Sequence, residues 1–126
     1  MKVKLYRCPR CGNIVTMLHD TGVVPHCCGT AMEELLPKSE DMGNEKHLPV
    51  VKVEGNKVHV EVGSVLHPMT VEHSIQFVIL ETNKGFKVNK CHETPITDFV
   101  LGEDEEALAV YEYCNLHGLW KTEIAK

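Results

Sequence analysis

The residues best suited to chemistry in this chain are its cysteines and histidines, since thiolate and imidazole are common protein ligands of zinc, iron and copper. There are six cysteines and eight histidines among 126 residues. Cys114 and His117 stand three positions apart, after an alternating apolar run and just before Gly118. A strand that ends in Cys-x-x-His can present two ligands to one metal from a tight turn. Alone this spacing is a weak signal, and its weight depends on ligands elsewhere in the chain.

Two more cysteine pairs lie near the N-terminus. Cys8 and Cys11 are separated by two residues, with Gly12 allowing the backbone to turn back, whereas Cys27 and Cys28 are adjacent. Four thiolates suit a tetrahedral site for zinc or a single iron. A unit this short cannot bury enough apolar surface to fold unaided, so we expect a metal to stabilise it. A zinc ribbon is the simplest alternative, although adjacent cysteines depart from the ribbon spacing.

The histidines fall into two groups. His19, His26 and His59 are interpreted as solvent-exposed, and His92 as a loop residue with no obvious metal partner. The other four lie at expected strand ends or in loops, where ligands from distant parts of the chain can meet: His47, His67, His73 and His117. Spacing alone does not establish that these four converge.

The elements that must position these ligands are strands. Valines alternate with charged residues on both sides of Gly55-Asn56, which is typical of a two-residue hairpin turn. Apolar or alternating segments predict strands at residues 51–53, 58–62, 74–81, 86–90, 97–101, 107–113 and 119–124. About seven short strands without helical periodicity predict a mainly β fold, with an immunoglobulin-like seven-stranded β-sandwich. We expect a metal-bound domain at residues 1–36, a polar linker at 37–44 and the sandwich at 45–126.

Composition excludes several classes of function. The formal net charge of −5 argues against a nucleic-acid partner, which would require a clustered basic surface. The apolar runs are far too short to span a bilayer, and the N-terminus lacks the apolar stretch of a secretory signal. We therefore expect a cytoplasmic protein without a membrane partner, in which structural disulfides are uncommon and metal ligation best explains the cysteines.

In these motifs the chain resembles the desulfoferrodoxins, the two-iron superoxide reductases, over essentially its whole length. Cys8, Cys11 and Cys27-Cys28 match the desulforedoxin-like N-terminal domain of that family. The matches to its catalytic domain are Glu45-Lys46-His47-x-Pro49, His67-Pro68-Met69, His73 and Cys114-Asn115-x-His117-Gly118.

The resemblance implies two iron cofactors. One is a rubredoxin-type iron bound by Cys8, Cys11, Cys27 and Cys28. The other is a catalytic iron with four equatorial histidines, His47, His67, His73 and His117, and Cys114 as the axial thiolate. Glu45 is similar to the glutamate that occupies the sixth position after oxidation, and Lys46 to the lysine that attracts the anionic substrate.

The implied activity is one-electron reduction of superoxide to hydrogen peroxide, a detoxification reaction. Five protein ligands on an octahedral ferrous ion leave one position open, and a thiolate opposite that position donates electron density toward it. The family also implies electron transport from an external donor such as rubredoxin, and a homodimer. The resemblance leaves open whether the N-terminal iron relays electrons or only stabilises the fold. It also leaves open whether that site holds iron or zinc.

Two alternatives from other classes remain at this point. A blue-copper electron-transfer protein also closes a β-sandwich with Cys-x-x-His, but it uses two histidines and often a methionine after the last one, and Leu119-Trp120-Lys121 offers none. A zinc-ribbon binding module without catalysis would leave Cys114 and four histidines unused. Cys91 is left over in each case, and we interpret it as a small, partly buried apolar residue.

Overall fold

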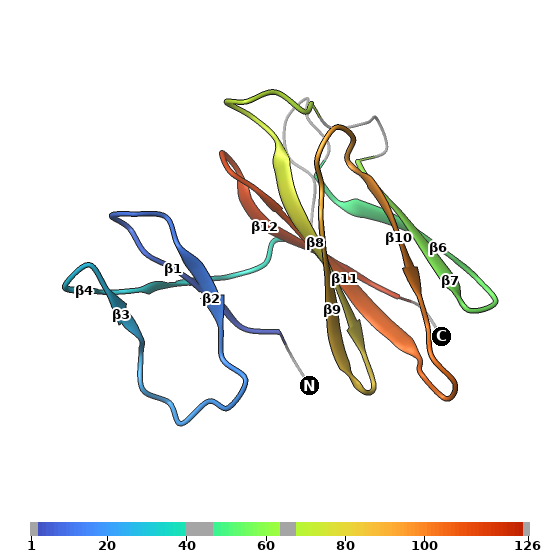
Figure 1. The fold of residues 1–126 in the computed structure, drawn as a ribbon, viewed down its shortest axis with the longest axis horizontal. Helices are drawn as coiled ribbons and strands as arrows, with labels where there is room; N and C mark the ends of the chain where they lie inside the picture. The colour runs from blue at the N-terminus through green and yellow to red at the C-terminus, as the bar shows by residue number, and fades with distance from the viewer. Residues whose placement is uncertain (1–2, 40–46, 64–67, 125–126) are drawn as a thin grey trace. The chain divides into compact units, whose positions relative to one another are not determined.

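The computed structural model describes residues 3–39, 47–63 and 68–124. Within these ranges every regular element is a β-strand, and none is a helix that could cross a membrane. The chain divides into two compact units, Lys2–Leu36 and Pro37–Lys126. Figure 1 shows the strands of both units.

The first unit is small and has two sheets. A three-stranded antiparallel sheet has the order β2-β1-β5, and a short hairpin is formed by β3 and β4. The strands are β1 (Leu5–Arg7), β2 (Ile14–Thr16), β3 (His26–Cys27), β4 (Thr30–Ala31) and β5 (Glu33–Leu35). Among the described residues, one buried apolar cluster contains Tyr6, Cys8 and Met32, with Met17 and Cys27 packed against it, and Leu5 is buried as well. So small a core supplies little of the free energy needed to fold, which leaves room for a stabilising metal.

The described part of the second unit contains seven strands in two antiparallel sheets. One sheet has the order β10-β7-β6 and the other β12-β11-β8-β9. Their bounds are β6 (Pro49–Glu54), β7 (Lys57–Val62), β8 (Ile75–Thr82), β9 (Gly85–Lys90), β10 (Ile96–Val100), β11 (Ala107–Cys114) and β12 (Gly118–Glu123). The mainly β fold predicted from the alternating pattern is confirmed.

One apolar core joins the two sheets. Val58, Val60 and Val62 of β7 are fully buried, because alternate residues of a strand point to the same face. They pack in one cluster with residues of the other sheet, among them Val78 and Val110. Gly55 has a φ of +59°, which permits the tight turn between β6 and β7. The hydrophobic residues of both sheets thus fix the strand ends from which the site residues project.

Part of the segment expected to be a linker pairs with the second unit. Lys38 forms a parallel bridge with Trp120 of β12. Its amide donates to the carbonyl of Leu119 at 2.9 Å, and its carbonyl accepts from the amide of Lys121 at 2.8 Å. The rest of that segment, residues 40–44, lies outside the described residues.

Candidate metal centres

The four N-terminal cysteines form one group. Their sulfur atoms all lie within 4.8 Å of one another. Cys11 Sγ is 3.6 Å from Cys27 Sγ, which is 3.9 Å from Cys28 Sγ. Four sulfurs on a tetrahedral ion, at about 2.3 Å each, would be about 3.8 Å apart. The donor set and its spacing therefore fit a single iron or zinc.

The local backbone explains how the first two sulfurs meet. Cys8 directly follows β1, and the Gly12 amide donates to the Cys8 carbonyl at 3.0 Å, which closes the turn. Gly12 has a φ of +81°, a conformation open to glycine at little cost. The Cys11 and Asn13 amides point at sulfur, at 3.4 Å from Cys8 Sγ and 3.5 Å from Cys11 Sγ. An amide directed at Cys8 Sγ favours its thiolate, the form that binds metal.

The adjacent pair lies in a two-residue hairpin loop. Cys27 of β3 pairs with Thr30 of β4, so Cys28 and Gly29 form the loop between them. Both have positive φ, +55° and +71°, as in the turns that match strand twist in short hairpins. A non-glycine residue rarely adopts such a φ, and here it brings two neighbouring sulfurs to one site. The cysteine spacing typical of zinc ribbons does not predict this hairpin loop.

The thiols of this group differ in acidity. Hydrogen bonding from the Cys11 amide lowers the pKa of Cys8 to about 6. Hydrogen bonding with the Cys11 sulfur, and then with those of Cys27 and Cys8, raises the pKa of Cys28 to about 12. Four crowded thiols do not all ionise readily without a cation, so their full ionisation is linked to metal binding.

A second group lies at one end of the sandwich. The ligand atoms of His47, His73, Cys114 and His117 all lie within 4.8 Å of one another. His47 Nε2 is 3.0 Å from His117 Nδ1, and Cys114 Sγ is 3.8 Å from the same His117 nitrogen. Neighbouring imidazoles bound at right angles to one ion, at about 2.1 Å each, would be about 3.0 Å apart. Three nitrogens and a fully buried sulfur therefore fit a transition metal.

These ligands come from distant parts of the chain. His47 precedes β6, His73 precedes β8, Cys114 ends β11, and His117 lies in the turn before β12. Cys114 pairs with Gly118, whose φ of +87° allows the turn that carries His117. Sandwich topology thus brings together strand ends that are as much as 70 residues apart.

Asn115 connects two of the ligand segments. Its carboxamide oxygen accepts from the Ser74 amide at 3.0 Å, and its nitrogen donates to the Glu72 carbonyl at 2.9 Å. Its own amide donates to the Ser74 carbonyl at 3.3 Å. These bonds fix the backbone on both sides of His73 against the turn that carries Cys114.

Trp120 supports the buried histidine and was not singled out by the sequence. Its ring stacks on that of His47, with centroids 4.8 Å apart and planes 12° apart. The Thr122 hydroxyl donates to the Pro49 carbonyl at 2.8 Å, which ties β12 to the segment that follows His47. The sequence contains one tryptophan, two residues after Gly118, but the spacing of residues along the chain does not predict that its ring stacks on His47.

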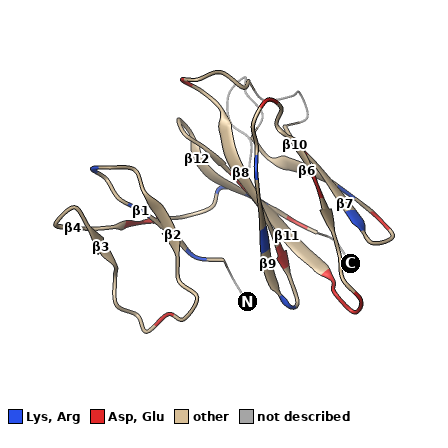
Figure 2. Ribbon diagram, in the orientation of Figure 1, with Lys and Arg blue, Asp and Glu red and all other residues tan. Residues whose placement is uncertain are grey.

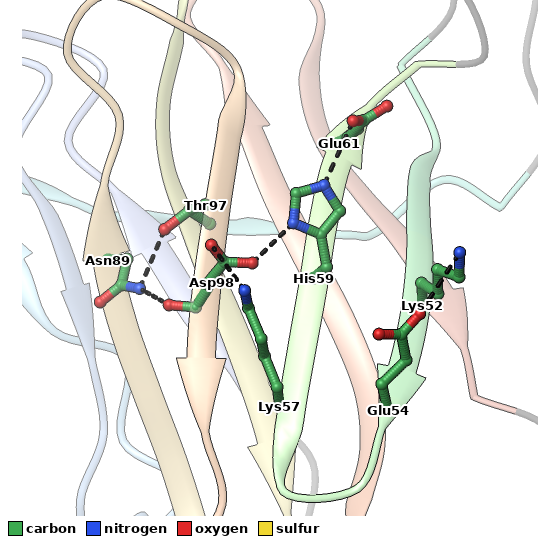
Figure 3. A network of polar contacts seen from close by, with 8 residues as sticks. All are labelled: Lys52, Glu54, Lys57, His59, Glu61, Asn89, Thr97 and Asp98. Carbon is green, nitrogen blue, oxygen red and sulfur yellow. Dashed lines mark hydrogen bonds and ion pairs between the residues drawn. The ribbon is translucent and has the colours of Figure 1, made fainter.

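Some of the predicted site residues lie outside the described residues, namely His67, Glu45 and Lys46. His59 was interpreted as solvent-exposed, but the structure places it between two carboxylates on the outer face of β7. Its Nδ1 is 2.6 Å from Asp98 Oδ1 and its Nε2 is 3.2 Å from Glu61 Oε1 (Figure 3). The hydrogen bond to Asp98, and then the one to Glu61, raise the pKa of His59. This histidine belongs to neither metal group.

Cys91 also belongs to neither group. It is half-buried against the sandwich core. Burial, followed by the charge of Glu112, raises the pKa of its thiol to about 11. A thiol that stays protonated at neutral pH is a poor nucleophile and a poor redox sensor. The packing role expected for Cys91 agrees with this environment.

Comparison with known proteins decides the family. The desulfoferrodoxin family profile matches residues 39–123. A desulfoferrodoxin homolog of Archaeoglobus fulgidus is 40% identical over 122 residues, covering 95% of this chain and 96% of the relative. The chain belongs to the desulfoferrodoxin family. A desulfoferrodoxin of Syntrophotalea carbinolica is also 40% identical, over 130 residues, with 97% of each chain covered.

A solved structure extends this family assignment to the fold. The superoxide reductase from Treponema pallidum superposes with a TM-score of 0.85 at 34% identity, covering 97% of this chain and 98% of that one. The desulfoferrodoxin family uses two iron sites. The described residues supply two groups able to bind metal, one of four cysteines and one of three histidines with a cysteine.

Proposed function

We propose that the chain is a superoxide reductase, which delivers one electron and two protons to superoxide and releases hydrogen peroxide. The convergence of three histidines with a buried cysteine at one end of a β-sandwich carries this proposal. The likeness to the Treponema pallidum superoxide reductase supports it over nearly the whole chain. The resemblance of the sequence motifs to the desulfoferrodoxins implies the same activity.

In this proposal His47, His73, His117 and Cys114 hold the catalytic iron, with His67 as the fourth histidine. When bound, ferrous iron with one open position supplies the electron. His47 offers Nε2 and His117 offers Nδ1, since these two atoms face each other at 3.0 Å. The Trp120 ring fixes the plane of His47, and the Asn115 carboxamide fixes the backbone around His73. Ligands held in this way need not rearrange when the metal changes charge.

Cys114 has a distinct role in the proposed reaction. Its side chain is fully buried, so the thiolate is shielded from solvent and from the oxidants that the reaction handles. A thiolate ligand donates electron density strongly, which favours transfer of an electron to the substrate. From the sequence resemblance, Lys46 would attract the anionic substrate, and Glu45 would offer a carboxylate to the oxidised iron.

The N-terminal unit, residues 1–36, is proposed to hold the second iron through Cys8, Cys11, Cys27 and Cys28. Four protein sulfurs fill a tetrahedral site, so this metal has no position for superoxide. A small reduced protein such as rubredoxin is proposed as electron donor, and the chain is proposed to be a homodimer. A reducing, cytoplasmic location suits six cysteines that form no disulfide.

Metal analysis with optical spectroscopy tests the proposal against its alternatives. We expect two irons per chain. The visible absorption bands should bleach when the protein is reduced and should return when superoxide is added. One copper would support an electron-transfer protein, and one zinc without redox change would support a binding module. Failure of a superoxide pulse to reoxidise the reduced protein would contradict the proposal.

A further inference from the structure

Lys38 lies against the histidine–cysteine group although it belongs to none of the motifs that predicted the site. Its Nζ donates to the His117 carbonyl at 2.9 Å. The same ammonium lies 5.0 Å from the centre of the Trp120 ring. Trp120 in turn stacks on His47. The Lys38 ammonium therefore contacts the backbone of one proposed ligand, His117, and the ring that stacks on another, His47.

The backbone holds Lys38 in this position independently of its side chain. Its amide and carbonyl bond to Leu119 and Lys121 of β12. These two bonds flank Trp120, so Lys38 acts as a one-residue extension of the sheet edge. Substitution of the side chain should consequently leave the segment docked, and the ammonium can be tested without unfolding the unit.

The electrostatic setting makes this cation important. Superoxide is an anion, and the chain has a formal net charge of −5. Figure 2 shows acidic residues gathered in the turn before β11, where the sequence runs Glu103, Asp104, Glu105 and Glu106. The proposed site lies at the other end of the eight-residue β11, about 25 Å away at roughly 3.3 Å per residue. That distance exceeds the ~8–10 Å screening length of physiological solutions, so charges near the site dominate there.

We propose that Lys38 is a positioning residue of the site, one that fixes the His117 turn and supplies positive charge where superoxide arrives. Among the described residues it is the one lysine whose ammonium is shown bonded to the metal-binding group. A cation beside the metal also favours the ferrous over the ferric state, because the ferric ion carries one more positive charge. This role rests on the proposed function and adds a second lysine to the one predicted at position 46.

The test compares three variants of the iron-loaded protein. Lys38→Met keeps an aliphatic stem over Trp120 but removes the charge and the hydrogen bond, and Lys38→Arg keeps both. Lys84→Met removes one charge from the exposed turn between β8 and β9, and serves as a control for net charge. The readouts are the reduction potential of the histidine–cysteine iron and the superoxide rate constant as a function of ionic strength.

We expect Lys38→Met to lower the reduction potential and to slow superoxide capture roughly threefold to tenfold at low salt, a difference that shrinks at high salt. Lys38→Arg should restore both values, and Lys84→Met should match the wild type. The role of Lys38 is overturned if Lys38→Met behaves like Lys84→Met, or if its defect persists in Lys38→Arg. Because the potential is measured without substrate, it tests Lys38 even if the chain proves not to reduce superoxide.

Discussion

The carboxamide of Asn115 bonds the backbone on both sides of His73, to the Glu72 carbonyl and to the Ser74 amide. One side chain thus fixes the loop of one proposed ligand against the turn that carries two others. Side chains that orient metal ligands commonly change metal affinity or activity by about 10- to 100-fold when they are replaced.

Asn115→Ala should accordingly weaken metal binding at the histidine–cysteine group by roughly tenfold, because the segment around His73 loses its bonds to the turn that carries Cys114 and His117. Titration of the metal-free protein with Co²⁺, followed through its thiolate charge-transfer absorption, measures this. Asn83→Ala, which removes an asparagine that bridges the Asp104 carbonyl and the Glu106 amide at the other end of the sandwich, is the matched control. Equal Co²⁺ affinity in the two variants would contradict the role given to Asn115.

Cys8→Ser should unfold the first unit and leave the sandwich folded. Cys8 is fully buried, and it belongs to a cluster with only Tyr6 and Met32 as other buried members. Without the metal so small a core cannot offset the chain entropy of folding. An amide NMR spectrum of the zinc-loaded protein should show lost dispersion for residues of the first unit alone. Cys91→Ser, at the cysteine outside both groups, should retain both sets of signals.

The His59 cluster predicts a pH dependence of stability. The pKa of His59 is raised in the folded protein by Asp98 and Glu61, so its contribution is fully present below the unfolded value of 6.5. That contribution is lost as the pH rises through the folded pKa. The side chain is 36% exposed, so the loss should be below about 1 kcal/mol.

Urea unfolding at pH 6 and pH 8 measures this effect. The wild type should lose more free energy of unfolding between the two pH values than His59→Asn does. His92→Asn, which alters an exposed histidine of a loop, should keep the wild-type difference. An identical pH dependence in wild type and His59→Asn would show that the cluster does not couple to folding.

Lys46→Ala should slow superoxide capture while both metals remain bound, because the resemblance assigns this lysine to attracting the anionic substrate. Stopped-flow measurement at low ionic strength gives the bimolecular rate constant, and metal analysis checks the sites. An unchanged rate constant, together with an unchanged rate in the control Lys84→Ala, would contradict a role in capture.

The sequence predicted the fold better than the surroundings of the site. Alternating valines at positions 58, 60 and 62 identify a half-buried strand directly, since burial on one face imposes a period of two. The convergence of His47 with His117 depends on how the two sheets pack, which no local spacing encodes. It became an expectation only through resemblance to a family.

Two further residues show what local pattern cannot provide. Lys38 follows a proline in a polar segment, a composition typical of a linker, and its pairing with Trp120 is purely tertiary. His59 lies on the charged face of its strand, as expected. Its carboxylate partner Asp98, however, comes from β10, and only the strand register places the two side by side.

The yield of hydrogen peroxide per superoxide consumed tests the proposed reductase activity most directly. The reduced, iron-loaded protein is mixed with a known amount of superoxide in the presence of a reductant that keeps it ferrous. Hydrogen peroxide is then measured. A reductase gives one peroxide for each superoxide, which is the predicted result. One peroxide for every two superoxides, with dioxygen released, would be dismutation and would contradict the proposed reductase activity.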